Sequence, residues 1–288
     1  MKYIPKPIRI LTGKLEMRLR SSANYRERIR FIDYAFMESL PEILPPKKTG
    51  LKDNIIWQYW DTGAVNAPEL IKVCIESVEK HKDTHLHYVL CDENIMDYIH
   101  LPDYITKNWN LINPTKRSNI LRLSLLTAYG GMWIDASCFI SGEIPEQYFN
   151  IDFFAYSNQG NDRILRNWFL CGKINHPVFN ALLRMHFKFY QNYLEPPSYF
   201  FFHYLFENLV TLNKEFRHLW MDLKTEDAIE EDEGLLRLSM GDSDRSGFIE
   251  GINQTWIHKL SWKLNPDVTN RLLLFLRQVT ISTLAHAI

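Results

Sequence analysis

Residues 115–137 read TKRSNILRLSLLTAYGGMWIDAS, and this stretch decides the fold. Its first half has apolar residues at helical spacing, followed by a glycine pair that predicts the end of a helix. Residues 132–134 then predict a short buried strand that delivers Asp135 at its carboxyl end, where ligands bind in open α/β sheets. An ordinary core helix followed by an unremarkable strand-end Asp would explain the same pattern. The apolar residues of the helix are Ile120, Leu121, Leu123, Leu125, Leu126 and Tyr129.

A longer pattern within this stretch gives it more meaning. The pattern is S-(D/N)-x-x-R, an apolar run, and then Y-G-G-x-(W/Y)-x-D-x-(D/S/T). It resembles the sugar-nucleotide site of GT-A glycosyltransferases. The resemblance is closest to capsular-polysaccharide-synthesis glycosyltransferases and glycosyltransferase family 32, and more remote to the glucosylating clostridial toxins. The matching residues are Ser118, Asn119, Arg122, Tyr129, Gly130, Gly131, Trp133, Asp135 and Ser137.

The resemblance implies a role for each polar residue of the pattern. Asp135 would bind Mn²⁺ or Mg²⁺ with Ser137, because a metal ion can neutralise a leaving diphosphate. Arg122 would hold the donor sugar or phosphate with its fork of N–H groups. Ser118 and Asn119 would contact the donor ribose or sugar. Asp135, Arg122 and Asn119 are therefore the expected catalytic residues.

Two residues depart from the family pattern. Asn119 stands where Asp is common, and an amide does not stabilise a developing positive charge as a carboxylate does. Ser137 stands where a second Asp is often found, and a neutral hydroxyl is a weaker metal ligand. Both departures bear on metal dependence and on the identity of the donor sugar.

The segment 54–60, NIIWQYW, predicts the first strand of the main domain. The resemblance aligns Trp57 with a residue that contacts the nucleobase. A tryptophan packed in the core is an equally good interpretation of Trp57.

The segment TWIHKLSWK, residues 255–263, resembles the C-terminal segment with which this GT-A group closes on the diphosphate and metal. His258 would complete the metal sphere, and Ser261 and Trp262 would bind the donor. Imidazole in the sphere would favour Mn²⁺ over Mg²⁺. A lone His is more often structural, and that interpretation of His258 also stays open.

Composition excludes some functions. The formal net charge is −1, so no global field favours nucleic acid as a partner. The four cysteines are widely spaced and predict neither a zinc site nor a disulfide framework. No run has signal-peptide character or the length of a membrane span, so we expect a cytoplasmic protein.

We expect two parts: a basic helical appendage at 1–48 and a catalytic domain at 49–288. Residues 1–30 carry nine basic residues against two acidic ones, and apolar residues recur among them at helical spacing. Such a helix can lie on an anionic membrane surface or pack on the catalytic domain with its basic face in water.

Further segments follow a β-α-β order. Residues 86–91 predict a second strand after a helix that begins at Pro68. Residues 94–109 predict further helix, with Pro102 at a helix start. Strands are expected at 138–140, 151–156 and 168–171, with helices at 177–193 and 199–212. The resemblance implies that the polar loop at 158–162 faces the acceptor, with Asn158 and Asp162 as acceptor or donor-sugar contacts. An ordinary solvated loop is the alternative for these two residues. Residues 222–247 predict a surface loop or lid, and residues 270–288 a helix for packing or for the membrane surface.

The predicted fold is therefore α/β: a GT-A, Rossmann-like domain with a mostly parallel sheet and helical additions at both ends. The resemblance implies transfer of a hexose from a nucleotide-sugar, first of all a UDP-sugar, with retention of anomeric configuration. The acceptor would be a glycan, including polyprenyl-diphosphate-linked glycans of capsule or O-antigen, at the inner face of the plasma membrane. The alternatives are a non-catalytic nucleotide- or glycan-binding domain and a sugar-phosphate transferase.

Overall fold

The computed structural model describes residues 40–51, 54–157, 165–222 and 251–285. Their centre is a five-stranded sheet with the order β2-β1-β3-β6-β5. β1 pairs in parallel with β2 and β3, whereas β6 is antiparallel to both β3 and β5, so four of the five strands run in one direction. The predicted α/β class and mostly parallel sheet are confirmed. The strands are β1 (Ile55–Tyr59), β2 (Leu86–Leu90), β3 (Gly131–Ile134), β5 (Phe153–Ser157) and β6 (Leu165–Gly172).

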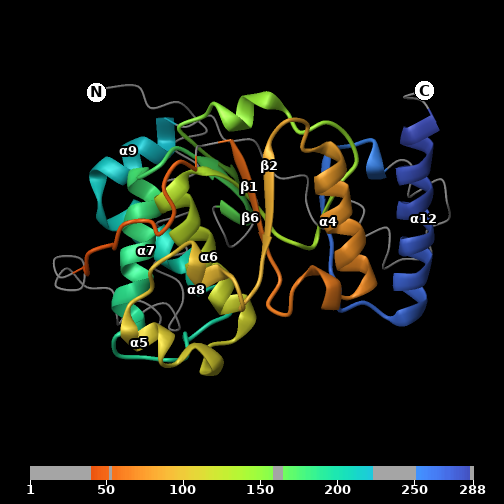
Figure 1. Ribbon diagram of the computed structural model, residues 1–288. Helices are drawn as coiled ribbons and strands as arrows, with labels where there is room; N and C mark the ends of the chain where they lie inside the picture. Colours follow the sequence, from red (N-terminus) through yellow and green to blue (C-terminus); the bar gives the residue numbers. More distant parts are fainter. Residues whose placement is uncertain (1–39, 52–53, 158–164, 223–250, 286–288) are drawn as a thin grey trace, which may run out of the picture.

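Helices cover both faces of this sheet (Figure 1). α6, α7 and α8 lie on one side, and α4 and α12 on the other. Alternate residues of β1 divide between the two layers: Ile55 and Trp57 join the core under α6, and Ile56 joins the opposite core. The helices are α4 (Glu69–His81), α5 (Asp103–Thr106), α6 (Pro114–Tyr129), α7 (Pro177–Tyr190), α8 (Phe201–Leu212), α9 (Lys214–Asp222) and α12 (Pro266–Ala285).

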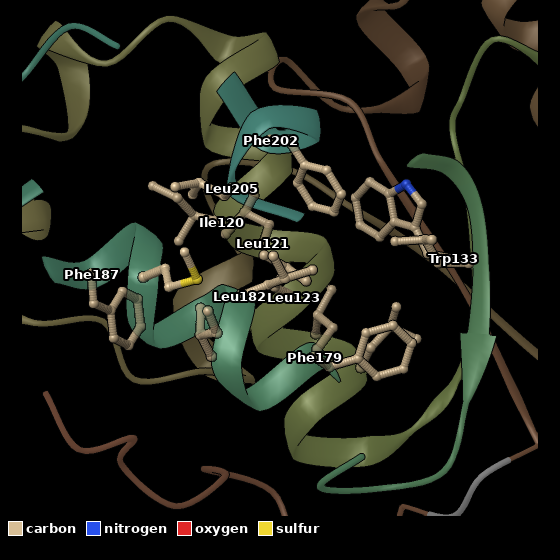
Figure 2. Packing of buried hydrophobic residues seen from close by; sticks show 14 of the residues in the cluster. Ile120, Leu121, Leu123, Trp133, Phe179, Leu182, Phe187, Phe202 and Leu205 are labelled. Carbon is tan, nitrogen blue, oxygen red and sulfur yellow. The ribbon is translucent and has the colours of Figure 1, made fainter. Parts of the chain in front are cut away.

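The helix α6 is buried on nearly all sides because it lies between the sheet and two further helices. Figure 2 shows Leu121 of α6 in the same apolar cluster as Leu182 of α7 and Leu205 of α8. Asn113 caps the first turn by accepting a hydrogen bond from the backbone N–H of Thr115. Residues on all sides of α6 are buried, including polar ones such as Asn119 and Arg122, as its central position requires.

The glycine pair after α6 makes the turn into β3. Gly130 has φ 64° and ψ −153°, and Gly131 has φ 86°. Side chains with a Cβ rarely adopt such angles, so both positions favour glycine. The turn places β3 directly after the helix, and Asp135 follows at the end of the strand.

Most predicted elements are confirmed with small shifts of their ends, but one prediction is wrong. Residues 94–109 do not form one helix: they contain the short 3-10 turns η2 (Ile95–Asp97) and η3 (Trp109–Leu111), with α5 between them. Pro102 caps α5 and separates it from η2, since proline disfavours a helical residue before it. Two other 3-10 turns are η1 (Ala64–Asn66) and η4 (Glu146–Phe149).

Residues 138–140 form the strand predicted for them, although this strand does not extend β3. They form β4 (Cys138–Ile140), which leaves the main sheet and pairs antiparallel with β7 (Ile257–Lys259). This small sheet brings the C-terminal segment to the end of β3. Helix α12 packs on α4 through Leu272 and Leu276, which favours the packing interpretation of the C-terminal helix.

Several predictions lie outside the described residues. These are the basic helix within residues 1–39, the sugar contacts Asn158 and Asp162, and most of the loop or lid at 222–247. Of the predicted appendage, residues 40–48 are described, and they lie against the main domain: Arg184 of α7 donates hydrogen bonds to the carbonyl groups of Leu40 and Pro41. The domain boundary stays a prediction. No helix within the described residues has the length and apolar character needed to cross a bilayer.

Candidate active site

Asp135 stands at the centre of a cluster of charged groups beyond the carboxyl end of β3. Its backbone N–H donates to the carbonyl of Trp168 on β6, at 2.8 Å, which fixes the residue at the carboxyl end of the central strand. Its Oδ1 accepts from the indole N–H of Trp133 at 2.8 Å and lies 3.2 Å from Nη2 of Arg122. The carboxylate is thus held in one orientation by two neighbouring elements.

Arg122 reaches Asp135 from the middle of α6. Its side chain is 3% exposed, and its guanidinium lies 5.0 Å from the ring of Trp133 and 5.9 Å from that of Phe202, two rings shown in Figure 2. Its N–H groups donate to the carbonyl and hydroxyl of Ser118, each at 3.1 Å, and to the carbonyl of Asn167. The structure therefore brings the predicted residues Ser118, Arg122 and Asp135 together. Most N–H groups of the Arg122 guanidinium already donate to protein oxygens.

Lys259 is the cation of this site that sequence reasoning missed. Its Nζ lies 3.1 Å from Oδ2 of Asp135 and donates a hydrogen bond to the hydroxyl of Ser137. The lysine follows His258 directly on β7, and successive residues of a strand point to opposite faces. If residues 257–259 had been predicted as a strand, His258 and Lys259 would have been expected on opposite faces, with only one of them toward Asp135.

Asn119 lies next to the ion pair on the buried side of α6. Its side-chain carbonyl accepts a hydrogen bond from the amide of Asn167 on β6, at 3.1 Å. Asn167 therefore contacts two α6 residues of the motif, Asn119 through its side chain and Arg122 through its backbone. Asn119 is 7% exposed, so only a small part of its surface is open to a ligand.

The predicted nucleobase contact of Trp57 is corrected by the structure. Trp57 is fully buried, its indole N–H donates to the carbonyl of Gly130 at 3.0 Å, and its ring stacks on Tyr88. A side chain without exposed surface does not reach a ligand, so the core interpretation holds. Three residues later Trp60 lies at the carboxyl end of β1 and is only partly buried.

Trp60 and Trp262 form an aromatic pair, and Trp60 packs against a small apolar cluster that includes Ala136, the residue after Asp135. Their ring centroids are 5.7 Å apart with planes at 84°, and Trp262 is 45% exposed. Ser261 lies next to Trp262 and accepts a hydrogen bond from the backbone N–H of Lys263 at 3.3 Å. Exposed aromatic faces are suited to bases and sugars, and this pair joins the predicted C-terminal segment to the end of β1.

His258 does not share the placement of Lys259. It is 3% exposed, its Nε2 lies 3.0 Å from the hydroxyl of Ser141, and its ring centroid is 6.4 Å from that of Phe139. Burial lowers the pKa of His258 to about 4, so the imidazole is neutral at pH 7. These contacts match the structural interpretation of His258 and do not join it to Asp135 and Ser137.

The charges of the centre stabilise one another. Burial raises the pKa of Asp135, but the charges of Arg122 and Lys259 outweigh this effect and hold it below its ordinary value. Burial also lowers the pKa of Lys259, and the charge of Asp135 reverses the effect and holds it above its ordinary value. At pH 7 the site therefore contains one carboxylate between two cations.

The residues as placed do not fit the divalent ion expected from the sequence. Both carboxylate oxygens of Asp135 and the hydroxyl of Ser137 already accept from protein donors, and Lys259 holds the space between them. Within the described ranges, no group of three or more His, Cys, Asp and Glu side chains gathers in a way that could hold a metal. Binding of Mn²⁺ or Mg²⁺ stays a prediction.

The solved structures similar to this chain include two that share little sequence with it. The chain is similar to "Crystal structure of a glycosyltransferase involved in the glycosylation of the major capsid of PBCV-1", with 9% identity, 76% of this chain and 98% of that chain covered, and a TM-score of 0.40. It is also similar to "PaToxG Glycosyltransferase", with 14% identity, 93% and 96% covered, and a TM-score of 0.36. No curated protein sequence matches the chain.

The family match is much more extensive than the motif that first indicated it. It runs over residues 15–277, which includes part of the basic N-terminal segment. This match confirms the resemblance to capsular-polysaccharide-synthesis proteins. The chain belongs to the family described as "Capsular polysaccharide synthesis protein".

Proposed function

We propose that this protein is a glycosyltransferase that moves a hexose from a nucleotide-sugar to a glycan acceptor in capsular polysaccharide synthesis. Membership of the family supports the biological role. The observation that carries the chemistry is Asp135, held between Arg122 and Lys259 at the carboxyl end of β3. The Trp60–Trp262 pair packs, through Trp60, against the cluster that includes Ala136, the next residue. This arrangement joins a cationic region for a diphosphate to aromatic faces for a base or sugar.

The reaction makes two demands on these residues. The bond between the anomeric carbon and the phosphate oxygen breaks, and its electron pair stays on the nucleoside diphosphate, whose charge increases. Positive groups that are already oriented stabilise that charge without reorganisation. The anomeric carbon then bonds to the acceptor oxygen, and the acceptor hydroxyl releases its proton, so the products are the glycoside, the nucleoside diphosphate and a proton.

The finer parts of the proposal rest on the motif resemblance. We take a UDP-sugar as the first donor to test, with retention of configuration. A polyprenyl-diphosphate-linked glycan of capsule or O-antigen is the first acceptor. The nine basic residues within 1–30 support a peripheral position on an anionic membrane surface, at the cytoplasmic face where such carriers are extended.

A donor screen tests the proposal. The full chain is mixed with UDP-, GDP-, dTDP- and CMP-sugars, each with Mn²⁺, Mg²⁺ or EDTA, and released nucleotide is measured. Release from one donor, absent in Asp135→Asn, is the expected result. Saturable nucleotide binding without release, even with glycan acceptors present, would favour the non-catalytic binding domain, which the departures at Asn119 and Ser137 permit. Transfer of phosphate with the sugar, read from product mass, would instead indicate a sugar-phosphate transferase.

A further inference from the structure

The position of Lys259 is set by the backbone. β7 pairs with β4 so that Lys259 lies opposite Cys138, and the N–H of Leu260 donates to the carbonyl of Ser137 at 2.9 Å. The ladder therefore holds the lysine against the residues that immediately follow Asp135. A cation held in this way is preorganised, unlike one on a free loop.

The ammonium group lies where its charge faces both the motif oxygens and the solvent. Its contacts are Oδ2 of Asp135 at 3.1 Å and the hydroxyl of Ser137. An ammonium has three N–H donors, and within the described part of the chain these two oxygens are its acceptors, which leaves one N–H for a ligand. The side chains of Lys259 and Asp135 are 22% and 21% exposed, so the pair is open to a ligand from one side.

The charge balance suits an anion. Asp135 contributes one negative charge, and Arg122 and Lys259 each contribute a positive one, so the cluster has one net positive charge. A divalent ion bound to the Asp135 carboxylate and the Ser137 hydroxyl would lie close to the Lys259 ammonium and be repelled by its charge. It would also compete with that ammonium for Asp135. A diphosphate, by contrast, would gain from the ammonium directly.

We infer that Lys259 is a catalytic residue that binds the diphosphate of the donor and supplies the positive charge expected from a divalent ion. This inference rests on the proposed transferase function and assigns a residue to its central step. When the anomeric carbon–oxygen bond breaks, the ammonium donates a hydrogen bond to a diphosphate oxygen as that oxygen becomes more negative. Asp135 and Ser137 orient the ammonium, and Arg122 fixes Asp135 from behind.

The first experiment separates phosphate recognition from base recognition. Binding of UDP and of uridine to the full chain is measured by calorimetry in excess EDTA, for wild type, Lys259→Met and Lys259→Arg. If the donor screen identifies a sugar of another nucleotide, the corresponding nucleoside diphosphate and nucleoside replace UDP and uridine. We expect Lys259→Met to weaken diphosphate binding about 10- to 100-fold, as for loss of a hydrogen bond to a charged group, and nucleoside binding less than about 2-fold. Lys259→Arg should retain an intermediate affinity because it keeps the charge.

The matched control is Lys107→Met, which removes a lysine that is 76% exposed and pairs with Asp103 at 3.7 Å. It should leave the binding of both ligands unchanged. Thermal unfolding of each variant verifies that the fold is intact. Equal loss of nucleoside and diphosphate binding in a folded Lys259→Met would overturn the inference, because it would indicate a general disturbance of the site.

The second experiment uses wild type alone, so it does not depend on the folding of a variant. Donor turnover is measured in excess EDTA and again with Mn²⁺ or Mg²⁺ restored. Undiminished turnover in EDTA is the expected result. Turnover that EDTA abolishes and metal restores would overturn the role of Lys259 while leaving the transferase function in place. Lys259-dependent diphosphate binding without turnover of any donor, with acceptors present, would support the diphosphate site and count against the transferase function.

Discussion

Nη2 of Arg122 lies 3.2 Å from Oδ1 of Asp135, and this ion pair ties the middle of α6 to the end of β3. The two residues are joined in the chain by the rest of the helix, the Gly130–Gly131 turn and the strand. Because the arginine is also bonded to Ser118 and Asn167, the pair belongs to a network that spans three elements. The carboxylate of the motif is thus oriented from the protein side, and its other oxygen faces Lys259.

Asp135→Asn should abolish sugar transfer with a modest loss of stability. The amide keeps a carbonyl for the Trp133 indole but no longer balances Arg122 and Lys259. Asp135→Ala leaves a buried arginine unpaired and should cost about 2–4 kcal/mol, toward the low side for a broken buried pair because Asp135 is 21% exposed. Donor turnover and urea unfolding measure the two effects. Wild-type turnover in a folded Asp135→Asn would remove Asp135 from the chemistry.

Arg122→Lys should weaken donor binding even though it conserves charge. A lysine does not reproduce the planar fork that serves Ser118, the Asn167 carbonyl and Asp135 together. The carbonyl of Asn167 would lose a partner, at a cost of about 1–3 kcal/mol in stability. Calorimetry with the donor and thermal unfolding provide the measurements. Unchanged donor affinity in this variant would show that the arginine network does not position the site.

Trp60→Ala and Trp57→Ala should affect different properties of the protein, the first nucleotide binding and the second stability. Trp60 is partly exposed beside Trp262, so its loss should weaken nucleotide binding by about 1–3 kcal/mol, as for loss of an aromatic stacking surface. Trp57 is fully buried, so its loss should cost about 3–5 kcal/mol in the free energy of unfolding. Nucleotide titration and chemical denaturation on both variants test the contrast. Equal nucleotide affinity in Trp60→Ala and wild type would exclude the aromatic pair from donor recognition.

His258 should make the protein less stable in acid. The folded pKa is about 4 because of burial, and the unfolded value is about 6.5. Between these values the unfolded state binds a proton that the native state does not, so the free energy of unfolding falls as pH drops from 6.5 to 4, by up to about 1 kcal/mol per pH unit. His258→Gln removes this dependence, and comparing both proteins by urea unfolding across the window isolates it. Parallel curves for the two proteins would contradict the neutral, buried state.

Gly130→Ala should destabilise the fold and weaken turnover. The residue has φ 64° and ψ −153°, a conformation that costs a Cβ-bearing residue about 1–3 kcal/mol. Relief of that strain would move β3 and with it Asp135. Thermal unfolding and donor turnover measure the two effects. The control is Gly142→Ala, because a Cβ added at Gly142 meets nothing within 4 Å. A Gly130→Ala protein as stable as the control would show that the turn does not need glycine.

Local sequence information was sufficient for α6, its glycine turn and the position of Asp135. Apolar spacing, a capping Asn and two glycines act over neighbouring residues, so the pattern alone determines them. The same holds for β1 and β2, whose strand-forming residues lie in continuous runs. The prediction of a helix over 94–109 was wrong because its apolar residues lie in short 3-10 turns and one short helix after Pro102. Helical spacing of apolar residues does not distinguish these from one continuous helix.

Contacts between distant segments were decided only by the tertiary structure. The sequence indicated that the segment around His258 meets Asp135, but the register of β7 on β4 determines that Lys259 faces Ser137 while His258 contacts Ser141. Likewise, the packing of α6 on the sheet buries Trp57 and leaves Trp60 at the edge. A shift of one residue in a strand turns every side chain to the opposite face of the sheet. The backbone pairing that sets this register joins residues more than 100 positions apart, such as Cys138 and Lys259.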